Sequence, residues 1–80
     1  MNATQIADFD RAAAFALASP FGPVSRARAR VFRLTLRELG FTAKLKPMTL
    51  LILLQMVTAG ESAAAREVYL EMANDLDTEE

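Results

Sequence analysis

The chain has 80 residues and contains neither cysteine nor histidine, so disulfides and an ordinary zinc site are excluded and there is room for one domain. Its formal net charge is −1 and 52% of its residues are hydrophobic, so stability has to come from a dense apolar core, from self-association or from a partner. Without histidine, cysteine or a glycine-rich phosphate loop, we expect no enzyme and no cofactor.

The first predicted helix begins at Asn2, which forms a capping-box pattern with Gln5. Its apolar side chains recur at helical spacing and are Ile6, Phe9, Ala13, Ala16 and Leu17. Pro20 ends the helix, because the residue before a proline is disfavoured in the α region. The acids Asp8 and Asp10 argue against a secretory signal in this alanine-rich segment, and we expect a cytoplasmic protein.

A turn-rich connector, SPFGPVS at 19–25, leads to a second predicted helix. Ser25 suits its N-cap and Gly40 suits a left-handed residue just past its end. Residues 26–31 alternate arginine with apolar side chains, which is also typical of a strand. We prefer the helix because it accounts for more residues. It gathers four arginines within about 60° of one face, a group we call the basic surface: Arg26, Arg30, Arg33 and Arg37.

The third predicted helix starts at Pro47, which suits a first helical position, and is apolar on nearly all sides over 48–57. Such a helix is normally central or buried against another chain. It is too short to span a bilayer, which needs about 20 residues, so we expect no membrane insertion.

Gly60 is expected to end the third helix and Ser62 to cap a fourth. The apolar stripe of this fourth helix consists of Ala65, Val68, Tyr69, Met72 and Leu76. Together the four segments predict an all-α fold, a small compact bundle of about four short helices. The domain is expected to span 1–76, and 77–80 is expected to be an acidic flexible tail.

Charge is segregated along the chain. Residues 26–46 hold seven cations and one acid, whereas residues 61–80 hold seven acids and one cation. In the fourth helix three acids repeat every four residues, a group we call the acidic surface: Glu67, Glu71 and Asp75. Three interpretations stay open: the two surfaces pair with each other, both are solvated, or one or both bind an outside partner.

Protein binding is the function that these features favour. An arginine surface suits phosphate contacts, but a polyanion would be repelled by the acids of the fourth helix in a helix-turn-helix arrangement. The acidic C-terminal residues lack the glycine and bidentate glutamate of a calcium loop, so no metal site is expected. We therefore expect a protein partner, with a homodimer through the third helix or the charged surfaces as one form. Nucleic-acid binding through the arginines is the alternative.

The whole chain also resembles the small, single-domain, non-enzymatic proteins of bacteriophages and mobile elements, including anti-CRISPR inhibitors. The resemblance is carried by the length, by DRAAAFALASP and SRARARVFR, and by the ending NDLDTEE. It implies a stoichiometric inhibitor that occupies a nucleic-acid or partner surface of a host effector. The acidic surface would then act as a phosphate mimic. No functional residue is transferred, because these segments contain no family motif.

Overall fold

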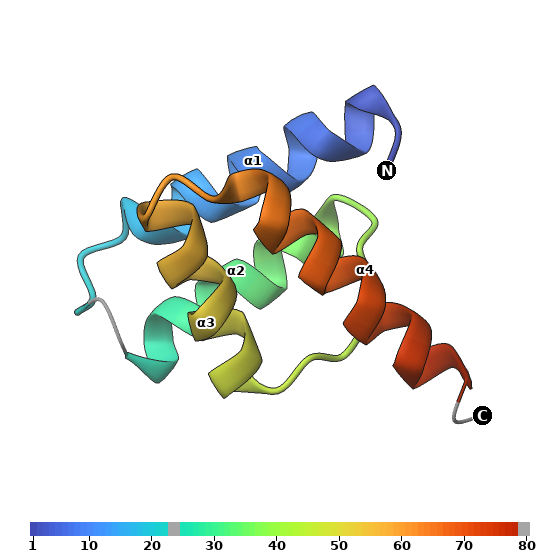
Figure 1. Cartoon of the computed structure of the whole chain (residues 1–80). Coiled ribbons are helices and arrows are strands. Elements are labelled where there is room, and N and C mark those ends of the chain that lie inside the picture. Colours follow the sequence, from blue (N-terminus) through green and yellow to red (C-terminus); the bar gives the residue numbers. More distant parts are fainter. Residues whose placement is uncertain (23–24, 79–80) are drawn as a thin grey trace.

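Four helices follow one another in the computed structural model of the chain, which describes residues 1–22 and 25–78, with side chains up to residue 75. They are α1 (Ala3–Leu17), α2 (Arg26–Glu38), α3 (Pro47–Thr58) and α4 (Ser62–Thr78) (Figure 1). No strand occurs in the described residues. The all-α prediction is confirmed, and residues 26–31 are helical rather than extended.

The first three helices begin where their local signals place them. Asn2 and Gln5 form the reciprocal capping box, with hydrogen bonds of 2.8 and 2.9 Å between each side chain and the other residue's N–H. The hydroxyl of Ser25 accepts a hydrogen bond from the first turn of α2, and Pro47 is the first residue of α3. Side chains that satisfy free N–H groups at a helix start therefore set these boundaries.

A glycine with positive φ ends α2. Gly40 has φ of 97°, and its N–H donates to the carbonyl of Arg37 at 3.1 Å. The N–H of Phe41 donates to the carbonyl of Leu36 at 2.9 Å. This pair of bonds is the Schellman motif, which requires a left-handed residue that glycine adopts at least cost.

The turn between α3 and α4 contains a second Schellman motif with a glycine of positive φ. Gly60 has φ of 84°, and the N–H of Glu61 donates to the carbonyl of Met56 at 2.9 Å. The carbonyl of Glu61 accepts the first helical hydrogen bond of α4, from Ala65 at 3.0 Å. Glu61 therefore occupies the N-cap position instead of the predicted Ser62, and Ser62 is the first helical residue.

Helix α4 continues to Thr78, two residues beyond the predicted domain boundary at 76. Residues 79–80, the remainder of the predicted acidic tail, lie outside the described residues, as does the side chain of Leu76. The last turns of α4 extend past the other three helices (Figure 1).

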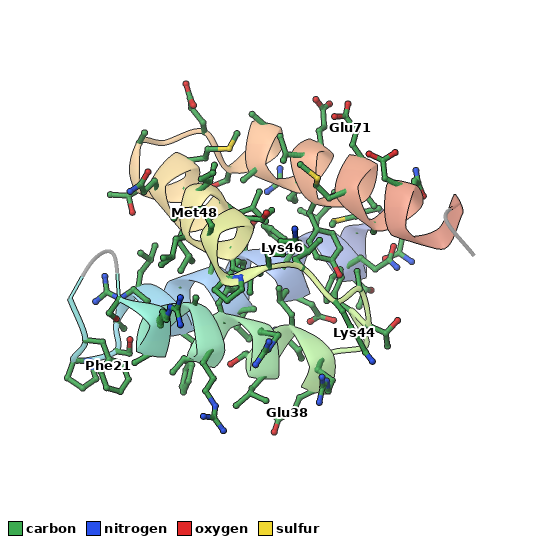
Figure 2. The ribbon with its side chains drawn as sticks, turned by 90° about the horizontal axis from the view of Figure 1, so that it is seen from below. Phe21, Glu38, Lys44, Lys46, Met48 and Glu71 are labelled. Atoms are coloured by element: carbon green, nitrogen blue, oxygen red, sulfur yellow. The ribbon has the colours of Figure 1, made fainter. Side chains whose placement is uncertain are left out.

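The helices pack as two consecutive pairs that share one core. Helix α1 packs against α2, α3 packs against α4 and also against α2, and α1 touches both α3 and α4. Seen from below, α4 runs along one side of the molecule and α2 along the other, with α1 and α3 between them (Figure 2). No Cα atom of α2 lies within 8 Å of one in α4 in the described residues.

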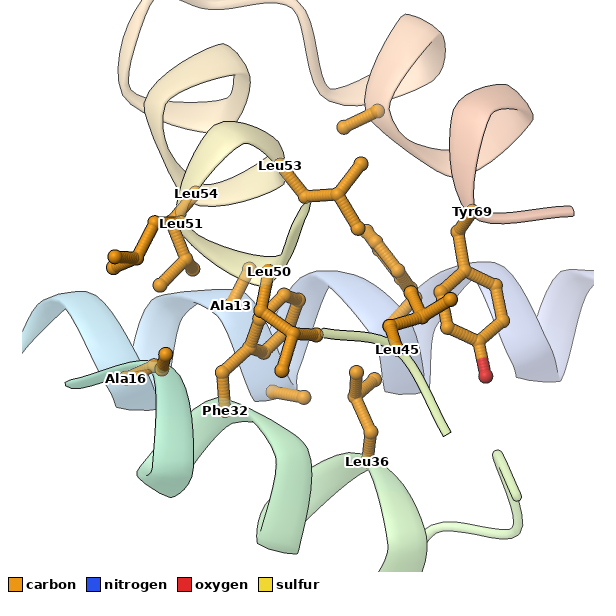
Figure 3. Packing of buried hydrophobic residues seen from close by; sticks show 14 residues of the cluster. Ala13, Ala16, Phe32, Leu36, Leu45, Leu50, Leu51, Leu53, Leu54 and Tyr69 are labelled. Carbon is orange, nitrogen blue, oxygen red and sulfur yellow. The ribbon is translucent and has the colours of Figure 1, made fainter. Parts of the chain in front are cut away.

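Phe9 lies at the centre of the core. Its ring makes edge-to-face contacts with Phe32, Tyr69 and Phe41, at centroid distances of 5.7, 5.5 and 6.1 Å. Around these rings pack side chains from α2, α3 and the linker before α3: Leu36, Leu45, Leu50, Leu51, Leu53 and Leu54 (Figure 3). On α1 the buried face is otherwise small, with Ala12, Ala13 and Ala16, which lets α2 approach α1 closely.

Candidate functional site

The basic surface lies along α2 and has no counter-charge in the described part of the chain. Arg26, Arg30 and Arg37 are exposed and Arg33 is partly buried. None of the four side chains takes part in a hydrogen bond or ion pair among the described residues. The Nε atom of Arg33 is buried and has no hydrogen-bond partner there. Since arginine keeps its charge at every physiological pH, this surface carries an uncompensated positive charge.

Three of these arginines surround a recess between α2 and the start of α3, which we call the arginine cavity. Its volume is about 170 Å³, and it is lined by Arg26, Ala29, Arg30, Arg33, Pro47 and Leu50. The structure therefore brings Arg26, Arg30 and Arg33 together around one cavity, and Arg37, one turn further along α2, lies outside its lining.

The acidic surface faces another direction. Glu67, Glu71 and Asp75 are all exposed on α4, and Glu71 points to the side of the molecule away from α2 (Figure 2). The basic and acidic surfaces therefore lie on two helices that do not contact each other in the described residues.

Every ion pair among the described residues includes a residue of α1, and none joins α2 to α4. Arg66 donates to both carboxylate oxygens of Asp10 at 2.7 and 2.9 Å, and Arg11 lies 3.7 Å from Asp8. The single cation of α4 is thus held by α1. The basic and acidic surfaces therefore do not pair with each other within the described part of the chain, which excludes the first of the three interpretations of the charge pattern for these residues.

Arg28 has a structural role that the charge pattern of α2 does not reveal. It is the one buried charged side chain in the described residues, and its Nη2 donates to the carbonyl oxygens of Ser19, at 2.9 Å, and Phe21. Ser19 directly follows the C-cap residue of α1, Ala18, where the helix dipole favours a cation. Helical spacing could have predicted the burial of Arg28. It precedes Phe32 by one turn and therefore lies on the same, buried side of α2.

Helix α3 is less completely buried than its composition indicated. Its leucines at 50, 51, 53 and 54 enter the core, but Met48 is 68% exposed and Ile52 48% exposed. These two residues, one turn apart, form what we call the apolar surface of α3. On α4, Met72 was predicted in the buried stripe but is 41% exposed, and Ala73 packs against the core instead.

A second, larger cavity lies beside Tyr69. It has a volume of about 540 Å³ and is lined by the start of α1, residues 40–44 and α4. Its lining contains one cationic side chain, Lys44, and no carboxylate. Burial raises the pKa of the Tyr69 phenol above 10.0, and a hydrogen bond with the backbone of Ala43 lowers it in part.

We expect this burial to make folding stability fall with alkaline pH. A phenol whose folded pKa is raised stabilises the fold fully below its unfolded pKa, near 10, and this contribution is lost as the pH rises through the folded pKa. The urea midpoint should therefore drop between about pH 8 and pH 11 by more in the native protein than in Tyr69→Phe. Equal drops in the two proteins would contradict the assignment.

Other kinds of site are not indicated by the described residues. No group of three or more acidic side chains gathers there in a way that could hold a metal ion. None of the helices in this part of the chain is both long enough and apolar enough to cross a membrane.

Comparisons with known proteins point to no relative. No protein-family model matches the chain, and neither a curated protein nor a solved structure matches it.

Proposed function

We propose that the protein is a non-catalytic module that binds another protein through its charged surfaces. The observation that carries this proposal is the separation of charge: the basic surface on α2 and the acidic surface on α4 lie on helices that do not contact each other, and neither surface has a counter-charge among the described residues. Surfaces of this kind steer association and select partners by complementary charge.

The apolar surface of α3 supports a protein partner. Pro47, in the wall of the arginine cavity, directly precedes Met48, so exposed apolar side chains adjoin the basic surface. Protein interfaces typically combine an apolar centre with a polar rim, and methionine adapts readily to a facing surface. An interface centred on Met48 and Ile52 with arginines at its edge has this composition.

The specific form of the proposal is a cytoplasmic inhibitor of a host effector, as the resemblance to phage and mobile-element proteins implies. In this form the acidic surface occupies a basic, nucleic-acid-binding groove of the effector. The basic surface contacts an acidic patch of the same partner. A second copy of the chain could also supply both complementary surfaces, and the oligomeric state distinguishes the two cases.

Charge reversal tests the proposal. Tagged protein would be used to capture partners from the organism that encodes it, in parallel with Arg26→Glu/Arg37→Glu and Glu67→Lys/Glu71→Lys. We expect at least one charge-reversed variant to slow association with the captured protein by roughly tenfold or more at low salt. Glu61→Lys is the matched control, since Glu61 is exposed in the α3–α4 turn, outside both surfaces.

A partner that binds both double variants as fast as it binds the native protein would refute the role of the charged surfaces. Light scattering over a range of protein concentrations measures self-association in the same preparations. A dimer that dissociates in either double variant, with no other protein captured, would identify the partner as a second copy.

Nucleic-acid binding remains the second candidate, because the four arginines of the basic surface have no partner among the described residues and α4 does not contact α2 there. Four phosphate contacts would lower the affinity for duplex DNA roughly 100-fold between 50 and 200 mM salt. Anisotropy of labelled duplex and single-stranded DNA and RNA at these two salt concentrations measures the effect. Tight binding with such a salt dependence would replace the protein-partner proposal with this one.

A further inference from the structure

The arginine cavity has the composition of an anion-binding site. Arg26, Arg30 and Arg33 line it from successive turns of α2, and its remaining walls, Ala29, Pro47 and Leu50, carry no charge. Three guanidinium groups around one cavity repel one another, and no carboxylate of the described residues pairs with any of them. A bound anion would relieve this repulsion.

Arg33 supplies the most specific evidence. Its Nε atom, like that of Arg28 outside the cavity, is buried and has no hydrogen-bond partner among the described residues. Buried N–H groups in folded proteins are nearly always paired, and an exception calls for an explanation such as a missing ion. Because Arg33 lines the cavity, an acceptor bound there is in position to pair with its guanidinium.

The start of α3 adds to the same site. Pro47, in the wall of the cavity, is the first residue of the helix, and the N-cap residue Lys46 makes no side-chain capping bond. The first turn of α3 contains no acidic residue. The first helical hydrogen bond is donated by Leu50 to the carbonyl of Lys46, so the N–H groups of Met48 and Thr49 have no acceptor within the helix. An uncapped helix start next to three arginines strengthens the positive potential.

We propose that the arginine cavity binds the terminal phosphate group of a small phosphorylated ligand. A terminal phosphate carries up to two charges and several acceptor oxygens, which match the three guanidinium groups better than a carboxylate or a phosphodiester does, each with a single charge. The cavity volume of about 170 Å³ is far above the roughly 10–15 Å³ that a single bound water needs, which leaves room for one phosphate group. The site goes beyond the proposed function, since binding a protein requires no phosphate.

Inorganic pyrophosphate is the probe. NMR spectra of arginine Nε–H groups would be followed during titration with pyrophosphate, and separately with acetate at matched ionic strength. We expect saturable one-to-one binding of pyrophosphate that shifts the Arg33 Nε–H resonance, and no saturation with acetate. Arg26→Ala and Arg30→Ala should each weaken the affinity by roughly tenfold or more, the effect of losing a charge-assisted hydrogen bond. Both side chains are exposed, so these variants should keep the fold.

Arg37→Ala is the matched control, because Arg37 lies on the same helix outside the cavity and should change the affinity less than twofold. Shifts that never saturate, or an equal loss in Arg37→Ala, would overturn the proposal in favour of diffuse attraction to a basic helix. Binding of a duplex oligonucleotide without binding of pyrophosphate would also overturn it and would assign the arginines to a nucleic-acid backbone.

Discussion

Replacing Phe9 by alanine is expected to unfold most of the protein or leave it barely stable. Phe9 is fully buried and its ring contacts three other aromatic rings in the centre of the core. A buried Phe→Ala change costs about 3–5 kcal/mol, whereas a chain of this length has a total stability of about 4–12 kcal/mol. Urea denaturation followed by circular dichroism should show a midpoint lower by roughly 3 M or more, at a slope of about 1 kcal/mol per molar.

Phe15→Ala is the matched control for this prediction. Phe15 lies on the same helix but is 62% exposed, so its removal should change the free energy of unfolding by no more than about 0.5 kcal/mol. Similar losses in the two variants would show that the faces of α1 are assigned incorrectly. The contrast therefore tests the orientation of α1 as well as the position of the core.

Replacing Arg28 by alanine is expected to lower the stability by about 2–3 kcal/mol. The guanidinium of Arg28 donates to the carbonyls of Ser19 and Phe21, which otherwise lack these bonds at the end of α1. The substitution also leaves space where a buried side chain was packed. Thermal unfolding measures the effect, which should be a decrease of roughly 10–20 °C in a domain of this size.

Two further variants test whether the charge of Arg28 or the shape of its guanidinium stabilises the fold. Arg30→Ala removes an exposed arginine of the same helix and should change stability by no more than about 0.5 kcal/mol. Arg28→Lys keeps the charge but replaces the planar guanidinium by a single ammonium group, so an intermediate loss is expected. An Arg28→Ala variant as stable as Arg30→Ala would refute a structural role for Arg28.

Local signals were sufficient to locate the helices. The capping box at Asn2, the cap at Ser25, Pro47 at the start of α3 and the glycine at 40 act through bonds between residues a few positions apart. Such bonds form in much the same way whatever the rest of the chain does. The error of one residue at the start of α4 arose because the backbone of Glu61, rather than the side chain of Ser62, occupies the cap position.

The candidate site was only partly predictable. Helical spacing placed the arginines of the basic surface on one face of α2, and the structure brings three of them to one cavity. The other wall of that cavity comes from Pro47 and Leu50, and no periodicity within α2 could reveal that α3 starts there. Likewise, the exposure of Met48 and Ile52 depends on which neighbours cover α3, not on the composition of α3.

By itself the sequence determined the number and approximate positions of the helices and the segregation of opposite charge into two of them, because propensity, capping and charge belong to short stretches of chain. Only the tertiary structure decided that α2 and α4 lie apart, so that their charges stay unpaired with each other. It also decided that Arg28 reaches back to the end of α1 and that Arg66 pairs with Asp10. These contacts depend on how the apolar faces of all four helices pack together, and packing is a property of the whole chain.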